Sequence, residues 1–195
     1  SGVFAGAMIS YDGRHAGWVL RLIQGDELRK LTIMLTAAVM AFALTTPAAM
    51  ADDPDFLVIG GGWYDFNDDK DAIDFRAEYR SDYKALGFLK PWIGIEATSD
   101  QAVYGVGGVL MDIYFGRRWV LTPSFGAGAY ADGSGKDLGH TVEFRSQLEF
   151  GYRFDDRSRM SLAVSHISNA SLGDNNPGTE IATIYYHIPF SDIID

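Results

Sequence analysis

The chain has 195 residues, no cysteine and a formal net charge of −10. Without cysteine it can form no disulfide framework, no cysteine-ligated zinc site and no thiol-based active site. The excess of acidic residues argues against a nucleic-acid partner, which would require a basic face. The length suggests one domain, and an apolar content of 47% is enough for either a packed core or a lipid-facing belt.

The N-terminal part of the chain carries a targeting signal. Basic residues at 29 and 30 precede the uncharged apolar run Leu31–Thr46, and small residues stand at Ala49 and Ala51. This order of a charged, an apolar and a small-residue region predicts a secretory signal peptide over residues 29–51, cleaved after Ala51. The alternative is a membrane-spanning helix, but the run is shorter than the roughly 20 residues that a span requires.

Residues 1–28 precede the signal peptide as an extension to which we assign no function. The mature domain is expected to comprise residues 52–195, with 12 basic and 23 acidic residues and therefore a net charge of −11. After Ala51 no segment is long and apolar enough for a transmembrane helix, and no helical period competes with the strand pattern.

The mature chain alternates between apolar and polar residues in segments separated by turn-forming residues, as β-strands do. Residues 72–81 show the pattern clearly, because the apolar side chains of Ile73, Phe75 and Tyr79 alternate with charged ones. Eight strands are predicted: Phe56–Phe66, Ala72–Ser81, Pro91–Ser99, Ala102–Phe115, Arg118–Tyr130, Thr141–Phe154, Arg159–Ser168 and Glu180–Phe190.

An even number of strands, with longer loops after the odd strands, is typical of an outer-membrane barrel. We therefore predict an all-β fold, an eight-stranded antiparallel up-and-down transmembrane β-barrel. Its polar column would fill the interior with ion pairs and its apolar column would face lipid. Periodicity alone leaves open a soluble lipocalin-type barrel with the two faces exchanged. Candidates for the aromatic girdles at the membrane interfaces are Trp63, Tyr64, Trp92, Trp119, Tyr152, Tyr186 and Phe190.

The last two predicted strands bring three polar residues to one end of an apolar face. In the first strand, the apolar column of Met160, Leu162 and Val164 continues into His166 and Ser168. In the second, Glu180 heads the column that contains Ala182, Ile184 and Tyr186. A hydroxyl, an imidazole and a carboxylate are the components of a nucleophile, a general base and an orienting acid.

The spacing of these residues is compatible with catalysis. Residues two apart on a strand lie about 6.6 Å apart along it, so the His166 imidazole can lean toward the Ser168 hydroxyl. Glu180 opens the neighbouring antiparallel strand and can hold the other ring nitrogen. A serine near a histidine at a strand end is more often a simple polar cap, so spacing alone does not decide for an active site.

The stretch HISNASLGDNNPGTE, residues 166–180, resembles the signature of the PagL-type lipid A 3-O-deacylases of Gram-negative outer membranes. That family has a His-x-Ser-Asn motif on its seventh strand, an Asn-Pro-Gly loop and a Glu on its eighth strand. The resemblance implies His166 as base, Ser168 as nucleophile and Glu180 as the acid that orients the histidine. It also implies supporting roles for Asn169 and Asn176, and Asn169, Asn176 and Gly178 are our candidates for oxyanion donors.

The resemblance further implies hydrolysis of the ester-linked acyl chain at the 3 position of lipid A (lipopolysaccharide), without a metal or other cofactor. The three residues continue the lipid-facing columns, an orientation that suits a substrate embedded in the outer leaflet of the outer membrane. Two other functions remain open at this point: a non-catalytic small barrel that serves as an anchor or adhesion surface, and a soluble periplasmic ligand carrier. Whether the barrel forms a homodimer is also left open.

Overall fold

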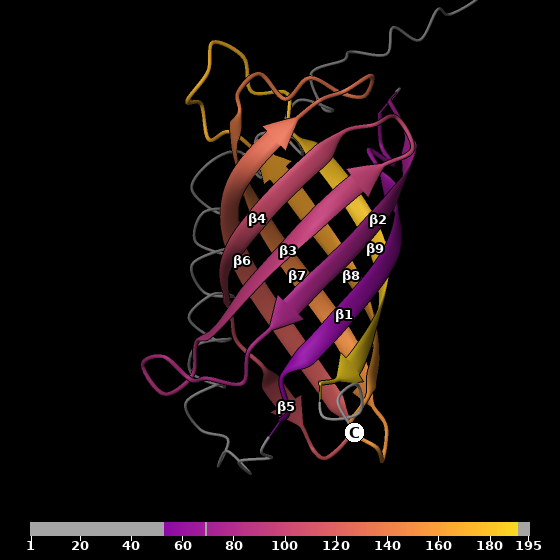
Figure 1. Cartoon of the computed structure of the whole chain (residues 1–195), viewed down its shortest axis with the longest axis vertical. Coiled ribbons are helices and arrows are strands. Elements are labelled where there is room, and N and C mark those ends of the chain that lie inside the picture. Colours follow the sequence, from indigo (N-terminus) through magenta and orange to yellow (C-terminus); the bar gives the residue numbers. More distant parts are fainter. Residues whose placement is uncertain (1–52, 69, 191–195) are drawn as a thin grey trace, which may run out of the picture. The chain divides into compact units, whose positions relative to one another are not determined.

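The structure is a computed structural model that describes residues 53–68 and 70–190. These residues form nine antiparallel β-strands in one closed sheet (Figure 1). The strands are β1 (Phe56–Tyr64), β2 (Ala72–Arg80), β3 (Lys90–Thr98), β4 (Val103–Leu110), β5 (Ile113–Phe115), β6 (Trp119–Ala131), β7 (Val142–Arg153), β8 (Arg159–Ser168) and β9 (Thr179–Pro189). The signal peptide predicted over residues 29–51 and the extension 1–28 lie outside the described residues.

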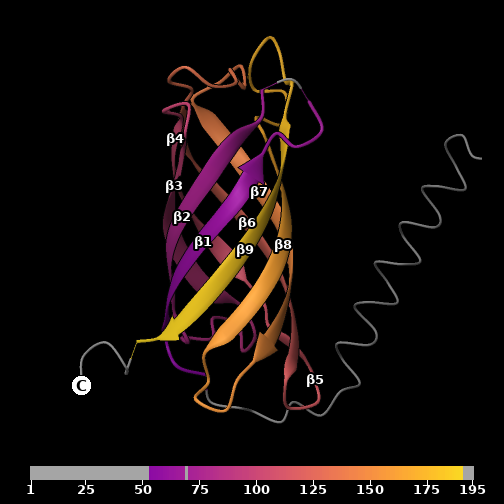
Figure 2. The same ribbon diagram turned by 90° about the vertical axis from the view of Figure 1, so that its right-hand side faces the viewer.

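The short strand β5 continues β4 rather than adding a ninth barrel strand. Leu110 at the end of β4 lies opposite Ser124 of β6, and Ile113 at the start of β5 lies opposite Leu121 of the same strand. The register is therefore unchanged across the interruption at residues 111–112. The barrel has eight strands, as predicted, and closes where β9 returns beside β1 and β6 pairs with β4. All of them tilt strongly relative to the barrel axis (Figures 1 and 2).

The charged column lies inside the barrel and the apolar column outside. On β2, the side chains of Asp74, Arg76, Glu78 and Arg80 are buried, while Ile73, Phe75 and Tyr79 are exposed. On β7 the inward side chains of Glu143, Arg145 and Glu149 are likewise buried, and the outward apolar face continues around the barrel; exposed apolar residues include Ile93, Ile95, Leu148, Phe150, Leu162, Val164 and Ile184. A charged interior with an apolar outer wall is the arrangement of a transmembrane β-barrel and the reverse of a lipocalin. The predicted fold class is confirmed.

Ion pairs fill the middle of the interior. Arg145 on β7 reaches across to Glu78 on β2, with 2.6 Å between Nη2 and Oε1, and its other Nη contacts Glu96. The Arg145 guanidinium also lies 4.2 Å from the ring centroid of Trp92. Buried charges are tolerated when each is paired and hydrogen-bonded. Because Arg145 and its carboxylate partners lie on opposite walls, the network joins these walls across the barrel.

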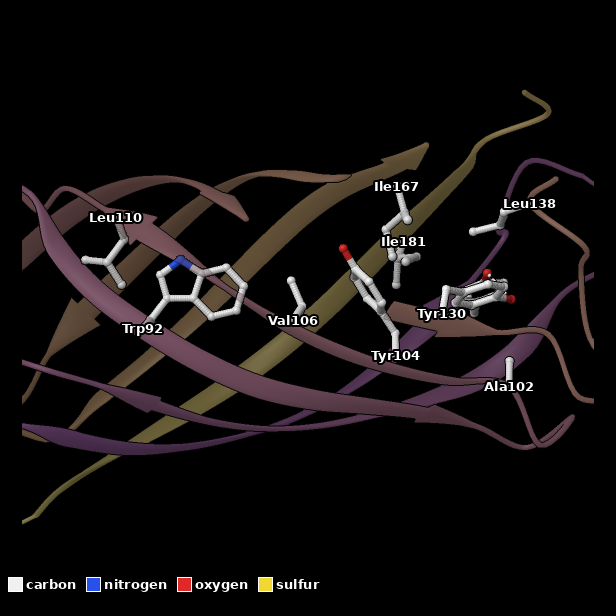
Figure 3. Close-up of a cluster of buried hydrophobic side chains, with 10 residues drawn as sticks. Trp92, Ala102, Tyr104, Val106, Leu110, Tyr130, Leu138, Ile167 and Ile181 are labelled. Atoms are coloured by element: carbon white, nitrogen blue, oxygen red, sulfur yellow. Dashed lines mark hydrogen bonds between the residues drawn. The ribbon is translucent and has the colours of Figure 1, made fainter. Parts of the chain in front are cut away.

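An apolar cluster extends along the interior, from Trp92 and Leu110 to the barrel end at which Ala102 and Leu138 lie (Figure 3). It includes Tyr104, Tyr130, Ile167 and Ile181 from four strands, together with Leu138 from the loop between β6 and β7. Leu138 is almost fully buried. The loop therefore inserts a side chain into the barrel mouth and packs on the cluster, which anchors the loop above the barrel end.

The prediction of a place in the aromatic girdles is wrong for two residues, Tyr64 and Trp92. Tyr64 and Trp92 point into the barrel and are almost fully buried, whereas Trp63, Trp119, Tyr186 and Phe190 are exposed as predicted and Tyr152 is half-buried. Adjacent residues on a strand face opposite sides, so an outward Trp63 forces Tyr64 inward. Its hydroxyl lies 3.0 Å from that of Tyr130, and Trp92 packs beneath Arg145.

The connections divide the barrel into two ends. The loops 65–71, 99–102, 132–141 and 169–178 lie at one end, which we call the site end. The connections 81–89, 116–118 and 154–158, with the start of β1 and the end of β9, lie at the other, which we call the terminus end. Among the described residues, no helix has the length and apolar character needed to cross a membrane.

Candidate active site

His166 and Glu180 form a cross-strand pair on the outer face of the barrel. They are direct partners in the β8–β9 register, and 3.1 Å separate His166 Nδ1 from Glu180 Oε1. The side chains are 49% and 37% exposed. Because the carboxylate occupies Nδ1, the imidazole is oriented and its Nε2 is the nitrogen left for a reacting group.

Ser168 lies two residues beyond His166 on the same outward face of β8 and is half-buried. A second serine also lies close to His166. Ser146 of β7 is its direct cross-strand partner and is exposed, and side chains of such partners stand about 5 Å apart. Ser146 could not be predicted as a site residue from the sequence, because its strand, read alone, gives no indication of its partner.

Gly178 brings the backbone of the β8–β9 loop against the imidazole. Its φ is +65°, and a Cβ at this position would stand 2.9 Å from His166 Cε1. A side chain is therefore excluded both by the left-handed backbone conformation and by the close approach. The loop bounds one side of the histidine ring and limits its movement.

We expect Gly178→Ala to reduce turnover by about 10-fold to 100-fold, because displacement of a catalytic group by about 1 Å has effects of this size. The change lies in a loop, so the barrel should still fold and migrate as a compact species on an unheated gel. Steady-state kinetics on a soluble ester would measure the loss. The matched control is Gly105→Ala on β4, where φ is not positive and a Cβ would meet no atom within 4 Å. Equal rates for Gly178→Ala and the unaltered protein would contradict this account of the ring's position.

The Asn169 side chain links two loops at the site end, and Asn176 accepts a hydrogen bond from the Asn169 backbone. Asn169 is fully buried, and its side-chain amide donates to the carbonyl oxygens of Leu138 and Asn175 at 2.7 and 2.8 Å. Both amide hydrogens are thus engaged, so the Asn169 side chain joins two loops. Asn176 accepts the Asn169 backbone N–H at 3.0 Å through Oδ1, which leaves its NH₂ group to donate elsewhere.

The turn that follows Ser168 has an unusual backbone. Ala170 and Ser171 have φ values of +52° and +65°, and the Leu172 N–H donates to the Asn169 carbonyl at 3.0 Å. Two consecutive left-handed residues without glycine cost roughly 1–3 kcal/mol each. This strained turn was not predicted from the sequence, because Ala-Ser lacks the glycine or asparagine that marks such turns.

An apolar groove lies on the outer wall, one outward residue pair away from His166 and Glu180. It has a volume of about 750 Å³ and is lined by residues that include Trp63, Leu148, Phe150, Leu162, Val164 and Ile184. Val164 and Ala182 are the next outward pair below His166 and Glu180. The small residues Gly61 and Ala182 leave space in the groove. A Cβ at Gly61 would meet only one atom, at 4.0 Å, so the space beside this glycine is open.

Comparison with known proteins decides the family. The family model described as "Lipid A 3-O-deacylase (PagL)" matches residues 75–189, more than half of the chain. The chain belongs to the PagL family. The similar protein "Lipid A deacylase PagL" of Bordetella bronchiseptica (strain ATCC BAA-588 / NCTC 13252 / RB50) is 29% identical over 77 residues, which cover 38% of this chain and 43% of that protein. The match thus spans less than half the length of this curated relative.

A solved structure supports the fold of this PagL family member. The chain resembles the structure titled "Crystal structure of the outer membrane enzyme PagL" with a TM-score of 0.54 and 16% identity, over 69% of this chain and 99% of that one. The family, together with the barrel's apolar outer wall, confirms the predicted location in the outer membrane of a Gram-negative bacterium. Among the described residues there is no group of three or more side chains arranged to hold a metal ion.

Beneath the PagL motif, a buried carboxylate connects three segments at the site end. Asp65 follows β1, is fully buried and has a φ of +55°. It accepts hydrogen bonds from Thr179 Oγ1 at 2.8 Å and from Lys136 Nζ at 2.7 Å. Thr179 precedes Glu180, whose carbonyl accepts the Phe66 N–H at 3.4 Å. Asp65 therefore ties the β6–β7 loop to the strand that carries Glu180.

Lys136 stays charged in this setting over a wide pH range. Burial lowers the pKa of Lys136, and the carboxylates of Asp65 and Asp68 raise it. The effect of the carboxylates is the larger, so the pKa lies above the ordinary value of 10.5. A raised lysine pKa stabilises the folded state fully below that ordinary value, and the stabilisation is lost as the pH rises through the folded pKa. The loop connection should therefore persist throughout the neutral range.

Replacing Lys136 with methionine should leave the Asp65 carboxylate buried without its cationic partner and loosen the backbone beside Glu180. We expect turnover to fall by about tenfold, with KM little changed because the groove is intact. Steady-state kinetics at pH 7 would measure both constants. The control is Lys70→Met in the exposed β1–β2 loop, and indistinguishable kinetics for the two variants would refute a role for the Lys136 connection.

Proposed function

We propose that this chain is an outer-membrane lipid A deacylase that hydrolyses the ester-linked acyl chain at the 3 position of lipid A. The observation that carries the proposal is the His166–Glu180 pair, which faces outward from the barrel at the upper end of the apolar groove. Membership of the PagL family supports the substrate class. An outward-facing pair beside an apolar wall suits a substrate that stays in the bilayer.

The proposed reaction proceeds through an acyl-enzyme on Ser168. His166 Nε2 takes the hydroxyl proton while Ser168 Oγ attacks the ester carbonyl carbon, and Glu180 stabilises the imidazolium through Nδ1. The tetrahedral intermediate collapses, the C–O bond to the lipid A sugar breaks, and His166 returns the proton to the leaving sugar oxygen. Water, deprotonated by His166, then attacks the acyl carbon. The bond from that carbon to Ser168 Oγ breaks, His166 returns the proton to Oγ, and the fatty acid is released.

The oxyanion of each tetrahedral intermediate needs hydrogen-bond donors. Of the three predicted candidates, the Asn169 side chain is engaged with the carbonyls of Leu138 and Asn175. We assign the role to the Asn176 NH₂ group and the Gly178 backbone. The hydrogen bond to Asn176 Oδ1 holds that side chain in one orientation, and Gly178 lies against the imidazole.

The position of the pair also suits the depth of the ester bonds in the outer leaflet. The longer loops of outer-membrane barrels are external and the termini periplasmic, so the site end would face outward. The groove descends from His166 and Glu180 toward the bilayer centre and is long enough to cover at least the pairs Val164–Ala182 and Leu162–Ile184. A fatty acyl chain in this groove would present its ester carbonyl to Ser168.

Mass spectrometry of lipid A tests the proposal. Lipid A from cells that express the chain should lose the mass of one hydroxyacyl chain, and fragmentation should locate the loss at the 3 position. Purified protein in detergent should release the same fatty acid from added lipopolysaccharide. An unchanged lipid A profile, with the protein folded and present in the outer membrane, would instead favour a non-catalytic barrel.

A further inference from the structure

The connection between β2 and β3 differs from the other two at the terminus end. It spans residues 81–89, whereas the others span 116–118 and 154–158. Outer-membrane barrels have short turns at this end. The connection also exposes apolar side chains: Tyr83 is 72% exposed, Leu86 82% and Phe88 52%. Exposed apolar groups this close together usually mark a contact surface.

The base of this loop is held to the barrel, so the position of its tip is defined. Asp55, just before β1, accepts the backbone N–H of Asp82 at 2.6 Å and the hydroxyl of Ser81 at 3.4 Å. The Ser81 N–H donates to the Pro91 carbonyl at 3.0 Å. These contacts fix both stems of the loop relative to β1 and β3.

The tip forms a small hairpin with internal backbone hydrogen bonds. Leu89 and Ala85 form an isolated antiparallel bridge, and the Gly87 and Phe88 N–H groups donate to the carbonyls of Lys84 and Ala85. Leu86 has a φ of +52°, which a branched apolar side chain rarely adopts. The hairpin presents Leu86 outward at the expense of local strain.

The loop projects sideways from the barrel wall, beyond the lower ends of β2 and β3, rather than along the barrel axis (Figure 1). The wall above it is apolar, because Tyr79 and Ile93 are cross-strand partners and both are exposed. The lipid-facing surface therefore continues from the wall onto the loop. Lys84 adds a cation beside the three apolar side chains, the combination that suits a phospholipid interface.

We propose that the loop 81–89 is a lateral membrane anchor that seats in the phospholipid interface of the periplasmic leaflet. Tyr83, Leu86 and Phe88 enter the boundary between headgroups and acyl chains, and Lys84 lies near the lipid phosphates. The internal hydrogen bonds of the hairpin reduce the number of backbone groups that must find a partner at this depth. The anchor limits tilting and sinking of the barrel, and so holds the opposite, site end at a constant depth.

Spin labelling tests the anchor directly, because the chain contains no cysteine and single-cysteine variants can be labelled cleanly. A nitroxide is attached at Leu86→Cys, at Leu162→Cys on the lipid-facing wall and at Asp155→Cys in the β7–β8 turn. Asp155 lies at the same end as the loop, with a side chain 91% exposed. Each variant is reconstituted in vesicles of phosphatidylethanolamine and phosphatidylglycerol, and collision rates with oxygen and with a nickel chelate are measured.

The label at Leu86→Cys should behave like that at Leu162→Cys, with a nickel collision rate several-fold below that at Asp155→Cys. Phe88→Cys provides a second position if the first label disturbs the hairpin, and the unheated gel mobility verifies folding. Nickel accessibility equal to that at Asp155→Cys at both positions would overturn the proposal. Strong dipolar broadening between labels would also overturn it, because a second copy of the chain would then cover the loop. Neither result depends on catalysis.

Discussion

Ser168→Ala is expected to abolish deacylation while leaving the barrel intact. Loss of a serine nucleophile in a Ser-His-acid site typically lowers turnover by a factor on the order of 10⁴ or more. Ser168 is half-buried on the outer face and is not part of the interior network, so folding should be unaffected. Mass spectrometry of lipid A from expressing cells should show the unprocessed species alone.

Ser146→Ala is the matched control for this substitution. Ser146 lies directly across from His166 and is exposed, so both serines are within reach of the imidazole by strand geometry. Ser146→Ala should retain most of the activity. If Ser146→Ala were inactive and Ser168→Ala active, the nucleophile would be assigned to the wrong strand. His166→Ala should match Ser168→Ala, since base and nucleophile act as a unit.

Arg145→Met is expected to cause the largest loss of stability. Arg145 is 1% exposed and binds Glu78 and Glu96 on the opposite wall. Removal of one partner from a buried ion pair costs about 3–5 kcal/mol, because the remaining charge stays buried and poorly compensated. Urea titration of the folded barrel, followed by tryptophan fluorescence and by gel mobility, would measure the change in unfolding free energy.

Arg118→Met provides the comparison for an exposed ion pair. Arg118 Nη2 lies 2.7 Å from Asp155 Oδ1, and both side chains are largely exposed. Exposed pairs contribute about 0–1 kcal/mol, so this variant should unfold close to the unaltered protein. An unfolding free energy for Arg145→Met within the range of Arg118→Met would show that the interior network does not carry the stability attributed to it.

The fold could be predicted because a barrel strand has a period of two residues and, on strands such as β2 and β7, charged residues alternate with apolar ones. The alternation of apolar and charged residues can be read from β2 alone, without knowledge of its neighbouring strands. Face assignments at strand ends were less secure. Tyr64 and Trp92 are aromatic residues near strand ends, as girdle residues are, but their position in the alternation turns them inward. The interruption between β4 and β5 was also missed, since a single charged residue, Asp112, does not break the otherwise apolar run from Val109 to Phe115.

The local part of the candidate site could be predicted, and the part assembled from distant segments could not. His166, Ser168 and Glu180 belong to one hairpin, so their spacing is set by a single register. Asp65 and Lys136 are 71 residues apart, and no periodicity connects two loop residues. The buried position of Asn169 depends on the carbonyl of Leu138 from another loop, which sequence spacing does not reveal.

Covalent trapping of the nucleophile tests the central claim most directly. Outer membranes that contain the unaltered protein would be treated with a long-chain alkyl fluorophosphonate, and the modified peptide would be identified by mass spectrometry. We predict a single adduct on Ser168 that is absent in His166→Ala. An adduct on Ser146, or no adduct on a folded protein that deacylates lipid A, would contradict an outward-facing Ser168 activated by His166.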